Sequence, residues 1–242
     1  MVAGENIAKE VRAALERDPR VDFHGRAIEV RLDPDGTLIL EGELPTIAAK
    51  KIALEHAAAI RGVNGIVDRL RVTPTRLMGD GEIRDHLRAA LLEEPALDRC
   101  TIRTFESGRW QLVREAAAAP PCSIDLAINE GVVTLDGRVG NLSQKRLAGV
   151  LAWWVPGSRD VVNGLEVSPP QDDSEGEIAE AVKLVLDKDP LINGDRIRVR
   201  VRDAAVTLEG LVRNDAESEM AEMDAWYVFG VDRVVNRLER AT

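Results

Sequence analysis

The sequence predicts an α+β fold of three tandem small units, each ordered helix, strand, strand, helix, strand. Three helix-like starts, at Ile7, Ile83 and Ile178, each lie 12 positions before a proline. Three strand-like segments then end in a leucine, an acidic residue and a glycine, and 28 positions after each leucine stands Asp68, Asn163 or Asn236. Features that recur at a fixed spacing are the signature of an internal repeat.

Composition excludes several classes of protein. Of the 242 residues, 45% are apolar, which is enough for hydrophobic cores, and the formal net charge is −10. No apolar run approaches the roughly 20 residues of a membrane-spanning helix. The first 20 residues resemble a charged amphipathic helix rather than a secretory signal, so we expect a cytoplasmic protein. The acidic balance disfavours nucleic acid as a partner.

The third unit shows the predicted elements most directly. Its residues 197–201 alternate apolar residues with arginine, which is typical of a half-buried strand. Asp203-Ala204 predicts a tight turn, and Asn214 is a favourable N-cap for the second helix, as Thr46 is in the first unit. The predicted units are residues 1–74, 75–169 and 170–242.

The second unit carries an insertion of about twenty residues near positions 103–121. Its proline and glycine lie 42 positions apart, against 23 in the first unit and 20 in the third. The inserted segment fits either an extra hairpin arm or a short alanine-rich helix. Cys100 and Cys122 bracket it and would approach each other if it folds back as an arm. In a reducing cytosol we expect two free thiols.

Several short motifs accompany the repeat. They are most complete in the third unit, as Asp189-Pro190, Leu208-Glu209-Gly210, Gly230-Val231 and Val234-Val235-Asn236-Arg237-Leu238. The first unit has Asp68 at the closing asparagine, and the second has Glu94-Pro95. The joint recurrence of these motifs resembles the BON domain family. That resemblance implies two helices on one face of a three-stranded sheet, and a non-catalytic module that attaches to phospholipid surfaces or to other proteins, often in stress responses.

Aromatic residues are only 3% of the chain, so their positions are informative. Eighteen positions after the strand leucine stand Trp153 in the second unit and Trp226 in the third, followed by Trp154 and Tyr227. At 100° per residue, Trp153 and Trp226 face away from the apolar stripe of their own helix. Such residues pack on a neighbouring repeat or subunit, which we favour, or insert into a partner or a lipid interface. Trp110 in the insertion is a further candidate contact.

A two-residue period places four arginines of the third unit on one sheet face, opposite the core: Arg196, Arg198, Arg200 and Arg202. We favour a solvated face on which carboxylates such as Glu209 or Glu239 form ion pairs with these arginines. The alternative is an anion site for a lipid phosphate or an acidic partner. Residues 171–242 carry 10 basic and 17 acidic side chains, a net charge of −7, which disfavours an anionic membrane.

The glycines that follow strand two, Gly42, Gly137 and Gly210, are interpreted as structural turn residues with a backbone conformation that other residues avoid. The closing asparagine or aspartate is expected to bond a local turn.

We find no catalytic constellation, no metal-ligand cluster and no cofactor motif. The sequence therefore predicts a non-enzymatic binding or assembly module that needs no cofactor and acts by protein–protein association, with itself or within a larger assembly. Peripheral phospholipid binding is the alternative. The family resemblance implies a weaker alternative, the sensing of potassium or a metabolite.

Overall fold

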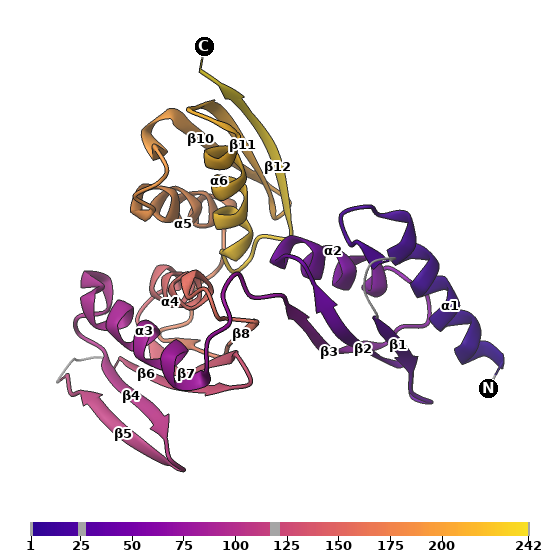
Figure 1. Ribbon diagram of the computed structural model, residues 1–242, viewed down its shortest axis with the longest axis horizontal. Coiled ribbons are helices and arrows are strands. Elements are labelled where there is room, and N and C mark those ends of the chain that lie inside the picture. The colour runs from indigo at the N-terminus through magenta and orange to yellow at the C-terminus, as the bar shows by residue number, and fades with distance from the viewer. Residues whose placement is uncertain (1, 24–27, 117–121, 242) are drawn as a thin grey trace. The chain divides into compact units, whose positions relative to one another are not determined.

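The computed structural model describes residues 2–23, 28–116 and 122–241. The chain forms two compact units, residues 1–73 and residues 74–242. The first unit holds the first repeat, and the second unit holds the other two. Within the described residues the model has three sheets, of three, six and three strands, and the helices of each repeat lie on one face of its sheet (Figure 1). The α+β class and the three-unit repeat expected from the sequence are confirmed.

The first unit runs in the predicted order. Its elements are α1 (Val2–Arg17), β1 (Glu29–Leu32), β2 (Thr37–Leu44), α2 (Ile47–Ala58) and β3 (Gly65–Val72). β1 pairs antiparallel with β2, and β2 pairs parallel with β3 across the α2 crossover. Leu38 and Leu40 of β2 and Leu15 of α1 are fully buried between helices and sheet. Thr46 caps α2 as predicted, since its hydroxyl accepts a hydrogen bond from the Ala49 N–H.

The third repeat has the same topology. Its elements are α5 (Glu175–Lys188), a short 3-10 helix (Gly194–Arg196), β10 (Ile197–Arg202), β11 (Ala205–Val212), α6 (Asp215–Tyr227) and β12 (Arg233–Arg240). The predicted tight turn joins β10 to β11: Asp203 and Ala204 both have positive φ, 49° and 56°, as a two-residue hairpin turn requires. Asn214 is the N-cap of α6, as predicted, and accepts a hydrogen bond from the Glu217 N–H.

The second repeat departs from the others because its insertion enlarges the sheet. Its elements are α3 (Asp80–Glu93), a 3-10 helix (Pro95–Leu97), β4 (Thr101–Glu106), β5 (Arg109–Arg114), β6 (Ser123–Asn129), β7 (Val132–Val139), α4 (Leu142–Trp154), β8 (Asp160–Asn163) and β9 (Glu166–Val167). The described part of the insertion is a hairpin, β4–β5, and β4 pairs parallel with β6. Six strands therefore replace the expected three. Residues 117–121 of the predicted insertion lie outside the described residues.

The expectation of two free thiols is wrong. Cys100 and Cys122 form a disulfide. Cys100 directly precedes β4 and Cys122 directly precedes β6, and the Thr101 N–H donates a hydrogen bond to the Cys122 carbonyl at 2.9 Å. The parallel pairing of β4 with β6 thus brings the two cysteines together at the same end of the strands. A disulfide here holds the base of the inserted hairpin to the strand that the repeat already contains.

The three recurrent glycines lie inside β2, β7 and β11, whereas the sequence placed them after the strand. Their φ angles, 148°, 120° and 137°, fall in the left-handed region that favours glycine. A Cβ atom on Gly210 would lie 2.0 Å from the Arg196 carbonyl oxygen, and one on Gly137 would lie 2.3 Å from that of Ser123. The neighbouring strand therefore approaches too closely for any side chain.

The closing asparagine ties the last strand to the second helix. Asn163 accepts a hydrogen bond from the Leu165 N–H, and its amide donates to the Lys145 carbonyl of α4 at 2.8 Å. Asn236 makes the corresponding bonds to α6. In the first repeat the carboxylate of Asp68 cannot donate, and Lys50 of α2 forms an ion pair with it at 2.9 Å instead. The bond to a local turn was expected, but the tie to the helix was not.

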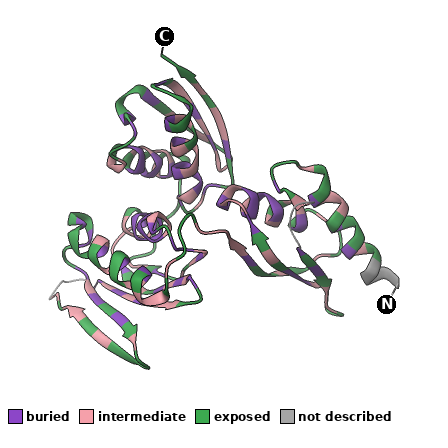
Figure 2. Ribbon diagram, viewed as in Figure 1, coloured by how far each residue is buried: buried purple, intermediate pink, exposed green. Residues whose placement is uncertain are grey.

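Buried side chains concentrate where helices face sheet (Figure 2). In the second repeat the buried core joins α3 and α4 to β4, β6 and β7. No helix among the described residues is both long enough and apolar enough to cross a membrane.

The disulfide leads to a prediction about stability. Replacing Cys100 and Cys122 together by serine should lower the free energy of unfolding of the second unit by about 3 kcal/mol, since the bond closes a loop of 22 residues in the unfolded chain. Calorimetry with and without reductant would measure this. Reductant should lower the melting temperature of the wild type and leave that of the variant unchanged, and a wild-type protein indifferent to reductant would contradict the role given to this bond.

Candidate functional site

The ends of α4 and α6 meet through aromatic side chains. The rings of Trp153 and Tyr227 are stacked, with centroids 5.6 Å apart and planes 10° apart. The Trp154 indole Nε1 donates a hydrogen bond to Asp224 Oδ1 at 2.8 Å. Trp153, Trp154 and Tyr227 are each half-buried. These three candidate contact residues thus face the neighbouring repeat within the same chain.

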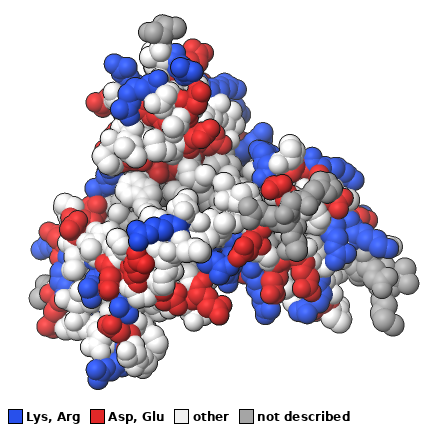
Figure 3. Space-filling view, in the orientation of Figure 1, with Lys and Arg blue, Asp and Glu red and all other residues white. Residues whose placement is uncertain are grey.

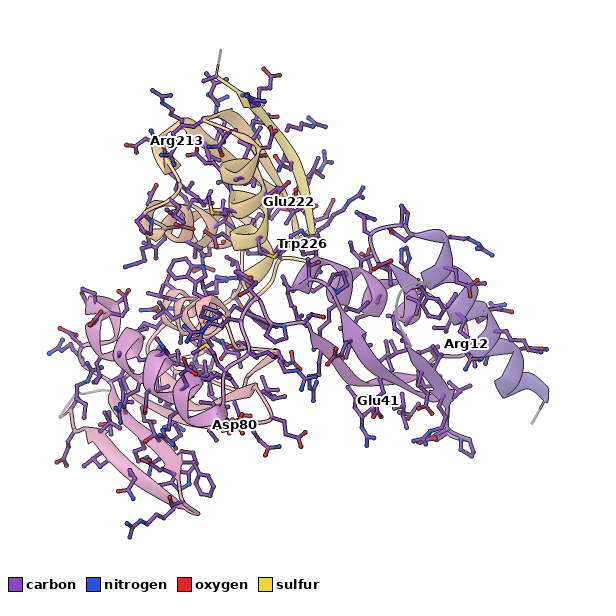
Figure 4. The ribbon with its side chains drawn as sticks, viewed as in Figure 1. Arg12, Glu41, Asp80, Arg213, Glu222 and Trp226 are labelled. Atoms are coloured by element: carbon purple, nitrogen blue, oxygen red, sulfur yellow. A yellow bond between two sulfur atoms is a disulfide. The ribbon has the colours of Figure 1, made fainter. Side chains whose placement is uncertain are left out.

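Trp226 has a different environment from its counterpart. It lies near the C-terminal end of α6 (Figure 4), and its side chain is only 2% exposed. Trp153 occupies the equivalent position of α4 and is half-buried. Equal spacing in the sequence therefore does not give the two tryptophans equal exposure.

A buried arginine lies in the same contact between repeats. The side chain of Arg146, in α4, is 1% exposed. Its Nε donates to the Phe229 carbonyl at 3.0 Å, and its Nη2 donates to both oxygens of Asp173, which precedes α5, at 2.5 and 2.6 Å. Burying a guanidinium is costly unless it is paired, so this geometry fixes how the third repeat sits on α4.

A second ion pair crosses between the repeats at the far end of α5. The Lys188 ammonium lies 2.9 and 3.2 Å from the two carboxylate oxygens of Glu94, which is 8% exposed. Glu94 also accepts a hydrogen bond from the Ala96 N–H. In addition, the Lys145 ammonium lies 4.8 Å from the centre of the Phe229 ring. Charged and aromatic groups together hold the second and third repeats as one compact unit.

The electrostatics of this contact centre on Asp224. Its pKa is raised to about 7: burial is the largest cause, the hydrogen bond from Trp154 acts in the opposite direction, and the nearby Asp189 adds to the rise. Burial also raises the pKa of Tyr227 to about 12, with a contribution from the charge of Asp224. Each group is held in its neutral form over a wider range of pH than in water.

The inserted hairpin carries a different surface, which faces solvent. Phe105, Trp110 and Leu112 are 43%, 46% and 58% exposed. Phe105 and Trp110 are cross-strand neighbours, and their rings meet edge to face with centroids 5.3 Å apart. Arg103, which pairs with Leu112 across the hairpin, makes two hydrogen bonds to Asp125 of β6. We call Phe105, Trp110 and Leu112 the arm patch.

The four arginines do not form one ladder. Arg196 belongs to the 3-10 helix that precedes β10, so the two-residue period holds only for Arg198, Arg200 and Arg202. Arg200 forms an ion pair with Glu209 at 3.3 Å, and Arg237 of β12 lies 3.7 Å from the same carboxylate. Positive and negative side chains are interspersed on the face seen in Figure 3.

Among the described residues, no group of three or more histidine, cysteine, aspartate or glutamate side chains is placed to hold a metal ion.

Sequence reasoning found the aromatic residues of the contact but missed its polar partners. Arg146, Asp173 and Asp224 stand among many charged residues of helices and linkers, where a solvent-facing position is the normal expectation. Asp224 in particular lies in a helix with several other acidic residues. The available signal was its position, two residues before Trp226 in the helix segment already assigned to a contact.

The buried arginine leads to a prediction. Asp173→Asn should destabilise the second unit by about 1–3 kcal/mol, because the guanidinium of Arg146 stays buried after its counter-charge is lost. Asp172→Asn is the matched control: it removes the same charge from an adjacent, exposed position. Urea unfolding of both variants would measure the difference, and equal midpoints would contradict the structural role of this pair.

No curated protein sequence matches the chain. Two solved structures of CdsD, a structural protein of the type III secretion system of Chlamydia trachomatis, one of them described as its C-terminal domain, are each 13% identical to it. They cover 97% and 98% of this chain and 96% and 93% of their own, with TM-scores of 0.25 and 0.24.

The BON domain matches the sequence over residues 4–74, 111–169 and 174–242. The second match begins within β5, because the inserted hairpin separates α3 from the rest of its repeat. The three matched segments cover most of the chain and coincide with the three repeated folds. The chain therefore belongs to the BON domain family, of which it carries three tandem copies.

Proposed function

We propose that this chain is a non-enzymatic assembly module that associates with other protein chains, in the first place with a second copy of itself, through the inserted hairpin of the second repeat. The observation that carries the proposal is the arm patch, whose Trp110 and Leu112 lie on β5. Membership of the BON family is consistent with a module that binds rather than catalyses.

β5 offers both kinds of group that strand pairing uses. It lies at the end of the six-stranded sheet and, within the part of the chain that the structure describes, pairs with β4 on one side only. An edge strand presents unpaired backbone N–H and C=O groups, and soluble proteins normally protect such an edge. Here the edge carries Trp110 and Leu112 on its exposed face instead. Pairing with another strand would satisfy the backbone groups and bring the apolar side chains of the two strands into cross-strand contact.

Two copies of β5 fit one another in an antiparallel register centred on Gln111. That register sets Trp110 of each copy opposite Leu112 of the other, so the two arm patches would form one continuous apolar face. It also sets Arg109 opposite Val113, which avoids placing Arg109 opposite Arg114. A shift by one residue in one direction would bring those two like charges together, so charge disfavours that alternative.

The helix-end aromatics take another role in this proposal. Trp153, Trp154 and Tyr227 join the repeats within the chain, so we assign them to positioning the second and third repeats. Trp226 directly precedes Tyr227 and is buried, and we assign it to the same role. Among the candidate contact residues, Trp110 is then the outward contact.

Peripheral binding to anionic lipid is the second candidate, and the exposed Arg198 and Arg202 favour it. Against it, Glu209 forms ion pairs with Arg200 and Arg237, and residues 171–242 carry a net charge of −7. Nothing among the described contacts points to potassium or a metabolite. We therefore place protein association first.

The cytoplasmic location expected from the sequence stays a prediction. The disulfide between Cys100 and Cys122 counts against it, because such bonds persist mainly in oxidising compartments. A role in stress responses likewise rests on the family resemblance alone.

Self-association leads to a prediction. Trp110→Ser combined with Leu112→Ser should keep the protein monomeric at concentrations where the wild-type mass, measured by light scattering, rises toward twice 26.5 kDa. Leu211→Ser is the matched control, since Leu211 is as exposed as Trp110 but lies on the central strand of another sheet. In the proposed register Gln111→Cys should cross-link two copies under mild oxidation, and Val113→Cys should not.

Two outcomes would count against the proposal. A wild-type protein that stays monomeric up to about 100 µM would exclude self-association as the function of the arm patch. Flotation with anionic vesicles that depends on Arg198 and Arg202, and not on Trp110, would move lipid binding to first place.

A further inference from the structure

A carboxyl group is buried where α6 meets α4. The Asp224 side chain is 4% exposed, and its Oδ1 accepts the hydrogen bond from the Trp154 indole. Its Oδ2 is also buried and has no hydrogen-bond partner among the described residues. An ionised oxygen left in this state is costly, whereas a bound proton removes the charge and turns the oxygen into a donor.

A comparison of repeats shows which group that donor faces. Asp224 and His56 both stand 16 positions after the strand-two leucine, and Asp189 and Asp18 both precede the proline that follows helix one. In the first repeat the His56 Nε2 lies 3.0 Å from Asp18 Oδ2. The third repeat thus places a carboxyl where the first has an imidazole, opposite the same aspartate.

In the third repeat the charge of Asp189 is near enough to raise the pKa of Asp224. Asp189 and Asp224 line one pocket, of about 370 Å³, together with Trp154, Tyr227 and Leu191. Asp189 Oδ1 accepts a hydrogen bond from the Leu191 N–H at 2.7 Å, which fixes its carboxyl group at the end of α5. Two carboxyl groups held this close are not both ionised without repulsion.

We propose that Asp224 is a pH-sensitive latch between the second and third repeats, closed when its carboxyl is protonated and weakened when the proton leaves. In the closed state Oδ1 accepts from Trp154 while the protonated Oδ2 donates toward Asp189. Both oxygens are then satisfied, and α4, α5 and α6 are joined at one point. Loss of the proton leaves two carboxylates facing each other in a buried site.

The nearby charge of Asp189, at the end of α5, favours the neutral form of Asp224. Tyr227 of α6 is uncharged near neutral pH because its pKa is raised to about 12, and Trp154 of α4 donates a hydrogen bond without titrating. The ammonium of Lys188 adjoins Asp189 in the chain but is held by Glu94. Burial and Asp189 together raise the pKa of Asp224 to about 7, so the proton leaves near neutral pH.

The direction of the pH effect follows from linkage. When the repeats separate, Asp224 returns to water and to its ordinary pKa of 3.8. Between these two values the separated form releases a proton that the closed form keeps, so raising the pH favours separation, by at most tenfold per pH unit. Above pH 7 both forms are ionised and the effect levels off. The contact is therefore tightest in acid.

This property goes beyond the proposed assembly function and does not depend on it. The latch concerns only residues between the second and third repeats, whereas self-association was assigned to the inserted hairpin. A partner that contacts both repeats would bind differently on the two sides of neutral pH.

The test uses the full chain labelled with nitrogen-15, from pH 5 to pH 9. We expect the indole N–H resonance of Trp154, assigned with Trp154→Phe, to titrate with a midpoint near 7. Hydrogen-exchange protection in α4 and α6, corrected for the intrinsic effect of pH, should fall by roughly fiftyfold between pH 5 and 7.

Variants separate the latch from a purely structural contact. Asp224→Asn keeps an acceptor for Trp154 and a donor toward Asp189, so it should remove the titration and retain at pH 8 the protection seen at pH 5. Asp189→Asn should move the midpoint to lower pH. Glu219→Gln, which removes the same charge from an exposed position of α6, should change neither.

The proposal is wrong if the Trp154 resonance does not move between pH 5 and 9, or if its titration survives Asp224→Asn. Should Asp224→Asn fail to fold, the wild-type titration and its displacement by Asp189→Asn still decide the matter. A midpoint that stays unchanged in Asp189→Asn would show that the two carboxyl groups do not interact.

Discussion

Much of the organisation of this molecule depends on the last turn of the second helix in each repeat. In the first repeat this turn carries Ala58 and Ala59, which are exposed and present little apolar surface. The second and third repeats carry large aromatic residues there, and these need cover. Trp153 and Tyr227 cover each other. This difference explains why the second and third repeats form one compact unit while the first forms a unit by itself.

Aromatic stacking alone would leave the orientation of the two repeats loosely defined, since apolar burial has little directional preference. Hydrogen bonds and ion pairs, which are directional, define the orientation of the two repeats. Arg146 reaches from α4 to Asp173 and to the Phe229 carbonyl, Lys188 pairs with Glu94, and Trp154 donates to Asp224. Each of these groups is costly to bury without its partner. A misaligned arrangement of the two repeats is therefore destabilised by more free energy than these contacts contribute to the aligned arrangement. The inserted hairpin lies outside this contact, which leaves the arm patch available for association with another chain.

The sequence was sufficient to predict the repeated fold, because periodicity, helix caps and turn residues are local signals. Thr46, Asn214 and the Asp203-Ala204 turn occupy their predicted places. Relations between distant segments were harder to predict: pairing of β4 with β6 brings Cys100 to Cys122, and a 3-10 helix removes Arg196 from the strand. The aromatic half of the contact between repeats was visible as a shared offset. Its polar half was not, because a charged residue in a helix gives no local sign that a neighbouring repeat will bury it.

Native-state hydrogen exchange under increasing urea tests most directly whether the contact between the ends of α4 and α6 makes the second and third repeats one folding unit. Amides of α4 and α6 should open in a single step, with the same free energy and the same dependence on urea, while those of α2 open in a step of their own. Opening of α6 at lower urea than α4, with α4 still fully protected, would show that the two repeats are independent and would contradict the account.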